Sequence, residues 1–244
     1  MAVVTGGGSG IGRATAERLA ADGAAVLVAD LNGQAAADVA EMITAAGGCA
    51  ASATTDVTDA ASVRDMAVSA IDAFGGVDIL VCSAGILRST RVAGITAEEW
   101  HLMVDVILTG TFLAAQAVQP SMVERGGGRI CNVASMAGRA TSTLGGAHYT
   151  AAKAGVLGLT RHLAREWAPD GIVVNAISPG IVDTPMAQAS RDAAGLEDVR
   201  RSIPLGRFAD PAECASLIAY LVSDEAAYIT GANVDIHGGE IIIA

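Results

Sequence analysis

Three residues in the second half of the chain have the types and the spacing needed to move a proton to or from an alcohol: Ser135, Tyr149 and Lys153. Tyr149 and Lys153 are four positions apart, so on a helix they share one face. An unperturbed tyrosine has a pKa of about 10, and a lysine ammonium about 4–5 Å away is expected to lower that pKa. Tyr149 then serves as a base for alcohol oxidation or as an acid for carbonyl reduction. Ser135 is expected to hydrogen-bond the substrate oxygen as charge develops there.

A glycine-rich run near the N-terminus predicts a binding site for the phosphates of a dinucleotide. The run Thr5-Gly6-Gly7-Gly8-Ser9-Gly10-Ile11-Gly12 follows an apolar stretch and leads into a helical pattern, which is the strand–loop–helix context of such a turn. The missing side chains let the backbone approach a pyrophosphate at the positive end of the helix. The predicted binding residues are Gly6, Ser9, Gly10, Ile11 and Gly12. A lone glycine run of this kind also fits a plain structural turn.

Asp30 ends the next apolar segment, eighteen positions after Gly12. A carboxylate there can accept hydrogen bonds from both hydroxyls of an adenosine ribose and would repel a 2′-phosphate. Because the glycine loop holds Ser9 rather than a basic residue, these features favour NAD over NADP. Leu31 is assigned to the same site. The structural alternative for Asp30 is an N-cap of the following helix.

The elements that position these residues follow from apolar, β-branched runs that alternate with helical stretches. We expect strands near 2–6, 25–30, 49–56, 77–83, 128–134, 172–178 and 232–236, and helices near 11–22, 33–46, 59–74, 97–125, 147–168 and 210–223. Several of these strands are apolar nearly throughout, as parallel strands buried on both faces are. The alternation predicts a single α/β domain over residues 1–244, with a Rossmann-type doubly wound parallel sheet of about seven strands and helices on both faces.

The segment from Ile181 to Leu205 interrupts this alternation. Connections of this length in compact domains are usually functional lids or disordered. It begins just past the sixth predicted strand, on the carboxyl edge where such sheets bind ligands. A substrate lid at 181–205 is therefore favoured over a plain mobile loop.

These features together resemble the short-chain dehydrogenase/reductase family across nearly the whole chain. No single segment would suffice, but all of them occur in the family's order and spacing. The matching segments are Thr5–Gly12, Asp56-Val57, Ser83-Ala84-Gly85, Asn132 to Ser135, Tyr149-x-x-x-Lys153, Asn175 to Gly180 and Gly231 to Gly239.

The resemblance implies further roles in cofactor binding. Asp56 and Val57 would contact the adenine, and Ser83, Ala84 and Gly85 would line the cleft through their backbone. Pro179, Gly180, Ile181 and Thr184 would hold the nicotinamide side, and Tyr149 and Lys153 also belong to this site, Lys153 through the nicotinamide ribose. The resemblance also implies a homotetramer in which the long helices around 97–125 and 147–168 pair between subunits.

The chain departs from the family pattern in the long helix after the fourth strand. The family usually has an asparagine in a Val-Asn-Leu-x-Gly context, and this chain has Ile107 at that position. The asparagine helps to hold a water that links the lysine to solvent, and isoleucine has no donor or acceptor for this task. We therefore expect slowed proton exchange, and expect that replacing Ile107 with Asn raises turnover. Smaller departures are Cys82-Ser83 in place of Asn-Asn, and a spacing of fourteen from Ser135 to Tyr149.

Composition excludes several other classes of function. The net charge of −11 argues against nucleic-acid binding, which needs clustered Lys and Arg. We find no apolar run of membrane-spanning length and no signal segment, so we expect no membrane partner and a cytoplasmic location. The four cysteines have no metal-ligand spacing, so no metal site is predicted, and they indicate a reducing compartment.

The residues together predict an NAD-dependent oxidoreductase that transfers a hydride between nicotinamide and a small-molecule secondary alcohol or ketone. Taken singly, Ser135, Tyr149 and Lys153 each also fit a structural role as a turn residue, an aromatic anchor or a solvated charge. His148 precedes Tyr149 but faces about 100° away from it on a helix, so it receives no proton role. The alternative function is a catalytically impaired NAD-binding sensor or scaffold, for which Ile107 is the only support.

Overall fold

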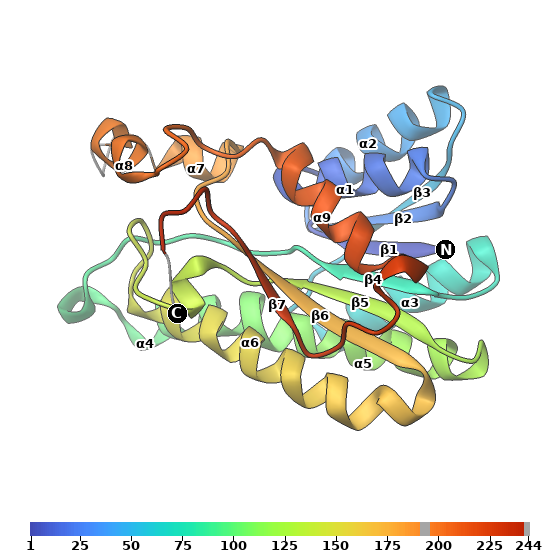
Figure 1. The fold of residues 1–244 in the computed structure, drawn as a ribbon. Helices are drawn as coiled ribbons and strands as arrows, with labels where there is room; N and C mark the ends of the chain where they lie inside the picture. The colour runs from blue at the N-terminus through green and yellow to red at the C-terminus, as the bar shows by residue number, and fades with distance from the viewer. Residues whose placement is uncertain (191–195, 242–244) are drawn as a thin grey trace.

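A computed structural model describes residues 1–190 and 196–241 and contains a seven-stranded parallel sheet (Figure 1). Within the sheet, Val4 lies opposite Val28 of one neighbouring strand and Val81 of the other. The predicted doubly wound parallel sheet is therefore confirmed. In spatial order the strands are β3 (Cys49–Thr54), β2 (Ala25–Asp30), β1 (Ala2–Thr5), β4 (Ile79–Cys82), β5 (Gly128–Val133), β6 (Ile172–Pro179) and β7 (Asn233–Ile236).

Helices cover both faces of the sheet, because each buried strand carries apolar side chains on both of its sides. Val4 belongs to the apolar cluster on one face, and its neighbour Val3 belongs to the cluster on the other. Figure 1 shows α1, α2 and α9 on one side of the sheet and α5 and α6 on the other. The helices of the first side are α1 (Gly10–Ala21), α2 (Gly33–Ala45) and α9 (Pro211–Leu221), and those of the second are α3 (Ala60–Phe74), α5 (Gly110–Glu124) and α6 (Ala147–Trp167).

The order of the strands creates a crevice beside β1. The chain passes from β1 to β2 and β3 on one side, then returns to place β4 on the other side of β1. At such a switch point the loops that leave neighbouring strands diverge and open a binding crevice at the carboxyl edge. The glycine run that follows β1 and the segment Ser83–Gly85 that follows β4 both leave the sheet at this edge.

The long helix predicted over 97–125 is not continuous. It consists of α4 (Ala97–Val104), a π-helical turn (Asp105–Thr109) and α5. The stretch Ala97–Glu124 also has the length and mean hydropathy, 1.5, of a candidate membrane span, which corrects the expectation that no segment does. Its α5 part packs against the sheet through residues such as Ala114, Val118 and Met122, and 39% of the most apolar window of the stretch is buried inside the chain. Some apolar side chains of the stretch, including Leu102 and Phe112, are therefore exposed.

The described part of the segment 181–205 includes the short helices α7 (Pro185–Ala189) and α8 (Leu196–Ser202). Its start is tied to the residues that follow its end, since Ala209 donates a backbone hydrogen bond of 3.0 Å to the carbonyl of Ile181. Thr184 caps α7 by accepting a hydrogen bond from the backbone of Ala187. The predicted lid includes residues 191–195, which lie outside the described residues.

Candidate active site

A cavity of about 570 Å³ opens at the carboxyl edge of the sheet, where the crevice beside β1 is expected. Side chains or backbone from the glycine loop, from the ends of five strands and from α6 and α7 line it. The predicted site residues that line it are Gly6, Ser9, Gly10, Ile11, Asp30, Leu31, Asp56, Val57, Ser83, Ala84, Gly85, Ser135, Tyr149, Lys153, Pro179, Gly180, Ile181 and Thr184. Residues that are up to 178 positions apart in the chain therefore meet around one cavity.

The glycine loop leaves an open space for a ligand because its glycines carry no side chains that would fill it. Gly6 has a φ of 65°, and a Cβ there would lie 2.7 Å from the Cα of Ala84. Gly10 has a φ of 52°, and a Cβ there would lie 3.1 Å from Cγ2 of Thr184. Only glycine adopts this backbone conformation without strain and also avoids the close contacts that a Cβ would make at these positions. Ser9 stands at the N-cap of α1 and is exposed to the cavity, where a phosphate oxygen can reach it.

Gly12, which the sequence assigns to the cofactor site, does not line the cavity. It is buried at the start of α1, and a Cβ there would lie 2.1 Å from the carbonyl oxygen of Gly6. Its role is therefore to let α1 pack directly against the loop. The prediction placed Gly12 in the right segment but gave it the wrong function.

Asp30 ends β2 and holds the glycine loop to that strand. Its Oδ2 accepts a 2.9 Å hydrogen bond from the backbone N–H of Gly8, and its Oδ1 accepts one of 2.9 Å from Asn32. The N-cap of α2 is Asn32, whose side chain accepts from Ala35. The N-cap alternative for Asp30 is therefore wrong. Each of its oxygens keeps acceptor capacity toward the cavity that Asp30 lines.

Beyond Asp30, the cavity reaches the residues that follow β3. Oδ1 of Asp56 accepts two hydrogen bonds from Thr58, one from its backbone N–H and one from its hydroxyl. Thr55 also lines the cavity, and its buried Oγ1 is without a hydrogen-bond partner among the described residues. A buried, unpaired hydroxyl beside a cavity fits a site that a polar ligand group completes. The sequence reasoning missed Thr55 although it directly precedes Asp56.

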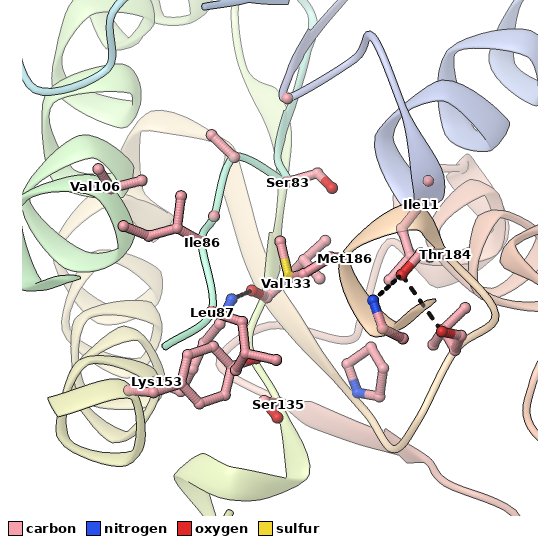
Figure 2. A pocket seen from close by; sticks show the side chains of 18 of the residues that line it. Ile11, Ser83, Ile86, Leu87, Val106, Val133, Ser135, Lys153, Thr184 and Met186 are labelled. Atoms are coloured by element: carbon pink, nitrogen blue, oxygen red, sulfur yellow. Dashed lines mark hydrogen bonds between the residues drawn. The ribbon is translucent and has the colours of Figure 1, made fainter. Parts of the chain in front are cut away.

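The three residues predicted for proton transfer all line this cavity, and Figure 2 shows Ser135 and Lys153 among the side chains around it. Ser135 follows β5 in an extended conformation, and its Oγ accepts a 3.1 Å hydrogen bond from the backbone of Ala137. Tyr149 lies in the first turn of α6, and Lys153 lies one turn later. The ammonium of Lys153 donates a 2.6 Å hydrogen bond to the carbonyl of Val133, drawn as a dashed line in Figure 2. The same nitrogen lies 5.8 Å from the centre of the Tyr149 ring.

The electrostatics of this group correct one expectation. Burial raises the pKa of Tyr149, and the hydroxyl of Ser135 acts in the opposite direction without overcoming burial. Burial also lowers the pKa of Lys153 to about 8. The expected lowering of the tyrosine pKa is therefore wrong for the chain by itself, because desolvation of the phenolate exceeds the attraction that was expected from the lysine.

Comparisons with known proteins agree with this geometry. The chain is 40% identical to a 3-oxoacyl-[acyl-carrier-protein] reductase of Synechocystis, over 99% of this chain and 97% of that protein. It is 41% identical to a D-threitol dehydrogenase of Mycolicibacterium smegmatis, over 99% and 93% respectively. A crystal structure of a short-chain type dehydrogenase/reductase from Mycobacterium marinum superposes with a TM-score of 0.95 at 38% identity, covering 99% of this chain and 95% of that one.

The match to a family model covers almost all of the sequence. A model described as enoyl-(acyl carrier protein) reductase matches residues 6–240. The chain belongs to the short-chain dehydrogenase/reductase family. It is accordingly an oxidoreductase of a family that binds a nicotinamide cofactor, NAD or NADP. The glycine cradle and the unpaired Thr55 hydroxyl fit a dinucleotide of this kind.

Ile107 marks a departure from the short-chain dehydrogenase/reductase pattern, and its side chain is buried in the π-helical turn. It belongs to an apolar cluster with Met103, Ala152 and Val156, and the ring of Tyr149 packs against that cluster. The backbone carbonyl of Ile107 accepts a 2.7 Å hydrogen bond from Thr111. The side chain thus supplies packing behind the active site of this short-chain dehydrogenase/reductase, where the family pattern has a polar amide.

The part of the cavity near Tyr149 is mostly apolar. Met186 belongs to the predicted lid, whereas Ile86, Leu87 and Val106 were not assigned, although Ile86 and Leu87 directly follow the predicted segment Ser83–Gly85. Figure 2 shows Ile86, Leu87 and Val106 on one side of this space, with Met186 opposite. The lining residues here are Ile86, Leu87, Val106, Met136, Leu144 and Met186, together with the hydroxyl-bearing Ser142 and Thr143.

Other chemistry receives no support from the described residues of this short-chain dehydrogenase/reductase. Within 1–190 and 196–241, no three His, Cys, Asp or Glu side chains gather in a way that could hold a metal ion. All four cysteines are free thiols, and burial raises the pKa of Cys82 and of Cys214 to about 12. These two thiols are therefore poor nucleophiles at neutral pH.

Proposed function

We propose that the chain transfers a hydride between NAD and a secondary alcohol or ketone, with Tyr149 as the acid or base. The observation that carries this proposal is that Ser135, Tyr149 and Lys153 line the same cavity as the glycine loop. A site that joins a dinucleotide cradle to a phenol, a hydroxyl and an ammonium has the groups that alcohol–carbonyl interconversion needs.

The preference for NAD rests on Asp30. Its carboxylate lines the cavity just beyond the glycine loop and is held by Gly8 and Asn32. A fixed negative charge accepts hydrogen bonds from ribose hydroxyls and repels a phosphate on the same ribose. Cofactor residues would further include Ser9 and Thr55 at the phosphate and adenine ends, respectively.

The chain's own residues would carry the proton chemistry. When bound, the nicotinamide supplies or accepts the hydride at the carbon of the reacting carbonyl or alcohol. In reduction the phenol of Tyr149 gives its proton to the carbonyl oxygen, and the Ser135 hydroxyl donates a hydrogen bond to that oxygen as negative charge develops. In oxidation the Tyr149 phenolate takes the alcohol proton. The ammonium of Lys153 stabilises the phenolate when the tyrosine has lost its proton.

The substrate end of the cavity supports a neutral, largely apolar substrate. Its walls include Leu87, Val106 and Met186, and two hydroxyls provide the polar contacts. We propose that the segment 181–205 closes over this end as a lid, because α7 lines the cavity and the base of the segment is tied down. The two named relatives act on different substrates, so they do not choose one for this chain.

We also propose a cytoplasmic homotetramer. The half-exposed side chains Trp100, Leu102 and Phe112 lie on the stretch Ala97–Glu124, which is long and apolar enough to suit a membrane span. A second copy of the chain is the partner that we propose for these exposed apolar side chains, with α6 pairing beside them.

The proposal is tested by screening secondary alcohols and ketones with NAD(H) and with NADP(H), following the absorbance of the reduced nicotinamide. We expect turnover with NAD(H), and expect its loss in Tyr149→Phe. Tight NAD binding with no turnover on any substrate would instead favour the sensor or scaffold function.

A further inference from the structure

The side chain of His148 connects the start of α6 to two segments outside that helix. His148 is fully buried, and its Nε2 lies 2.9 Å from Oε1 of Glu99 in α4. The same carboxylate oxygen accepts a 2.6 Å hydrogen bond from the hydroxyl of Thr90. On the other edge of the ring, Nδ1 accepts a 2.8 Å hydrogen bond from the backbone N–H of Tyr149. We refer to Thr90, Glu99 and His148 as the His148 cluster.

These partners specify the protonation state of the ring. Nδ1 accepts from the backbone N–H of Tyr149, so it carries no proton. Nε2 faces a carboxylate oxygen of Glu99, so the single ring proton is on Nε2. A doubly protonated ring would direct a second N–H against the N–H of Tyr149. The His148 cluster therefore requires a neutral imidazole in the Nε2–H form.

The hydrogen bond from Tyr149 satisfies a donor that the helix itself leaves open. The first backbone hydrogen bond of α6 runs from Thr150 to Gly146, so the N–H of Tyr149 is one of the open donors of the first turn. Gly146 stands at the N-cap and, as glycine, has no side chain to accept that N–H. The His148 ring takes over this capping task from inside the helix.

Gly145 and Gly146 allow the segment 86–90, which lines the cavity, to approach the first turn of α6 closely. A Cβ on Gly146 would lie 2.6 Å from the carbonyl of Thr90 and 2.8 Å from Cε1 of His148. A Cβ on Gly145 would lie 2.7 Å from the ring of Tyr149. Larger residues at 145 and 146 would therefore push the first turn of α6 away from the segment 86–90.

The segment 86–90 forms the wall of the cavity near Tyr149 through Ile86 and Leu87. It is held to α6 by a 2.8 Å hydrogen bond from the N–H of Gly146 to the carbonyl of Arg88. The His148 cluster adds a second attachment through the side chain of Thr90. The distance between this wall and the Tyr149 hydroxyl thus depends on groups that lie outside the cavity.

We infer that His148 is a positioning residue that sets the place of Tyr149 relative to the wall formed by residues 86–90, acting through Glu99 and Thr90. The inference rests on the proposed role of Tyr149 as the proton carrier. Proton and hydride transfer require the substrate oxygen and carbon to be placed together, and a misplacement of about 1 Å can cost about a hundredfold in rate. The glycine loop and Asp30, which are proposed to hold the phosphates and the adenosine ribose of the cofactor, share no hydrogen bond with the His148 cluster among the described residues.

Two substitutions test separately the hydrogen bond of His148 with Glu99 and the hydrogen bond that His148 accepts from Tyr149. His148→Asn places an amide oxygen near the position of Nδ1 but cannot reach Glu99, whereas His148→Gln can reach Glu99 but loses the acceptor for Tyr149. We expect each variant to lower kcat about tenfold or more, with a change of less than about twofold in NAD affinity. Wild-type kcat in both variants would overturn the inference.

His162 provides the matched control. It lies on the same helix, and its Nε2 is 2.9 Å from Glu166, but both side chains are exposed. His162→Asn and His162→Gln should leave kcat unchanged. An equal loss of kcat in the His162 variants would overturn the inference by tracing the effect to the helix as a whole.

Nitrogen NMR of the wild-type histidines tests the cluster without any variant having to fold. We expect His148 to be neutral with its proton on Nε2, and a proton on Nδ1 or on both nitrogens would overturn the inference. Full turnover by Tyr149→Phe would instead overturn the proposed function. Because the NMR result is independent of turnover, the two failures are distinguishable.

Discussion

The ammonium nitrogen of Lys153 lies over the ring of Tyr149, 5.8 Å from its centre. Within the part of the chain that the structure describes, Lys153 donates one hydrogen bond, to the carbonyl of Val133, and its remaining N–H groups can bind a ligand. Lys153 is buried and Tyr149 is partly buried, and burial disfavours the charged form of each. The tyrosine therefore tends to keep its proton and the lysine tends to lose one.

The raised pKa of Tyr149 predicts opposite pH dependence for the two directions of the reaction. Reduction uses the protonated phenol, which is the major form at neutral pH, so its rate should fall only in the alkaline range. Oxidation uses the phenolate, so its rate should rise as the pH increases from about 6 to about 8, the pKa of Lys153, above which the ammonium that stabilises the phenolate is lost. Initial rates in both directions check this. An oxidation rate that falls over this range contradicts the assignment.

Lys153→Met is expected to stabilise the chain and to abolish turnover. The pKa of Lys153 falls from 10.5 to about 8, and such a change corresponds to about 3 kcal/mol for the buried charge. Loss of the hydrogen bond to Val133 offsets part of this gain. We therefore expect the free energy of unfolding to increase by about 1–3 kcal/mol at neutral pH.

The pH dependence of that stabilisation is a separate check. Below about pH 8, Lys153 is protonated in both the folded and the unfolded chain, so the whole cost of burial is present and the gain of the Met variant is largest. Between about 8 and 10.5 only the unfolded chain keeps the proton, so the gain should shrink with rising pH. Urea unfolding of the wild type and of Lys153→Met at several pH values measures this difference in the free energy of unfolding. A difference that does not change with pH contradicts the buried-charge explanation.

Asp30→Asn should relax the preference for NAD. The amide can still accept a hydrogen bond from Gly8, but it no longer repels a phosphate on the adenosine ribose. We expect the ratio of kcat/KM for NAD to that for NADP to fall about tenfold or more. Asp22→Asn, which removes a surface carboxylate paired with Arg18, is the control and should leave the ratio unchanged. An unchanged ratio in Asp30→Asn would sink the role assigned to this residue.

Ile107→Asn tests whether the family's amide improves proton exchange in this chain. We expect turnover to increase and the free energy of unfolding to decrease by about 1–3 kcal/mol, because the amide enters the apolar cluster around Met103 and Val156. Ile107→Val keeps the position apolar and should leave turnover unchanged. Steady-state rates from about pH 7 to 10 together with urea unfolding measure both effects. If the rates of wild type and the Asn variant coincide throughout, the proposed defect does not exist.

Local sequence patterns were sufficient for the fold and for most of the cavity lining. The strand ends of β2 and β7 coincide with their apolar runs to within one residue, because turn residues bound those runs on both sides. The residues after the strands converge because parallel strands end at one edge of the sheet. Asp30 and Ser135 could therefore be assigned to one cavity from their places at strand ends.

The features that could not be predicted depend on contacts between distant parts of the chain. The direction of the Tyr149 pKa depends on how deeply the folded chain buries the ring, which spacing on a helix does not report. Gly12 was misassigned because its contact with the carbonyl of Gly6 arises only when α1 packs on the loop. His148 and Glu99 are 49 positions apart, so no local pattern joins them.

The π-helical turn between α4 and α5 has a consequence for how this chain can vary over evolution. Such a turn accommodates one residue more than an α-helix would, so it rotates everything before it by about 100° relative to everything after it. Val106 lies within the turn and faces the cavity, while α5 beyond it presents Ala114 and Val118 to the sheet. Deletion of a single residue here would turn one of these two surfaces toward solvent. Substitutions in this helix should therefore be tolerated more readily than any change in its length.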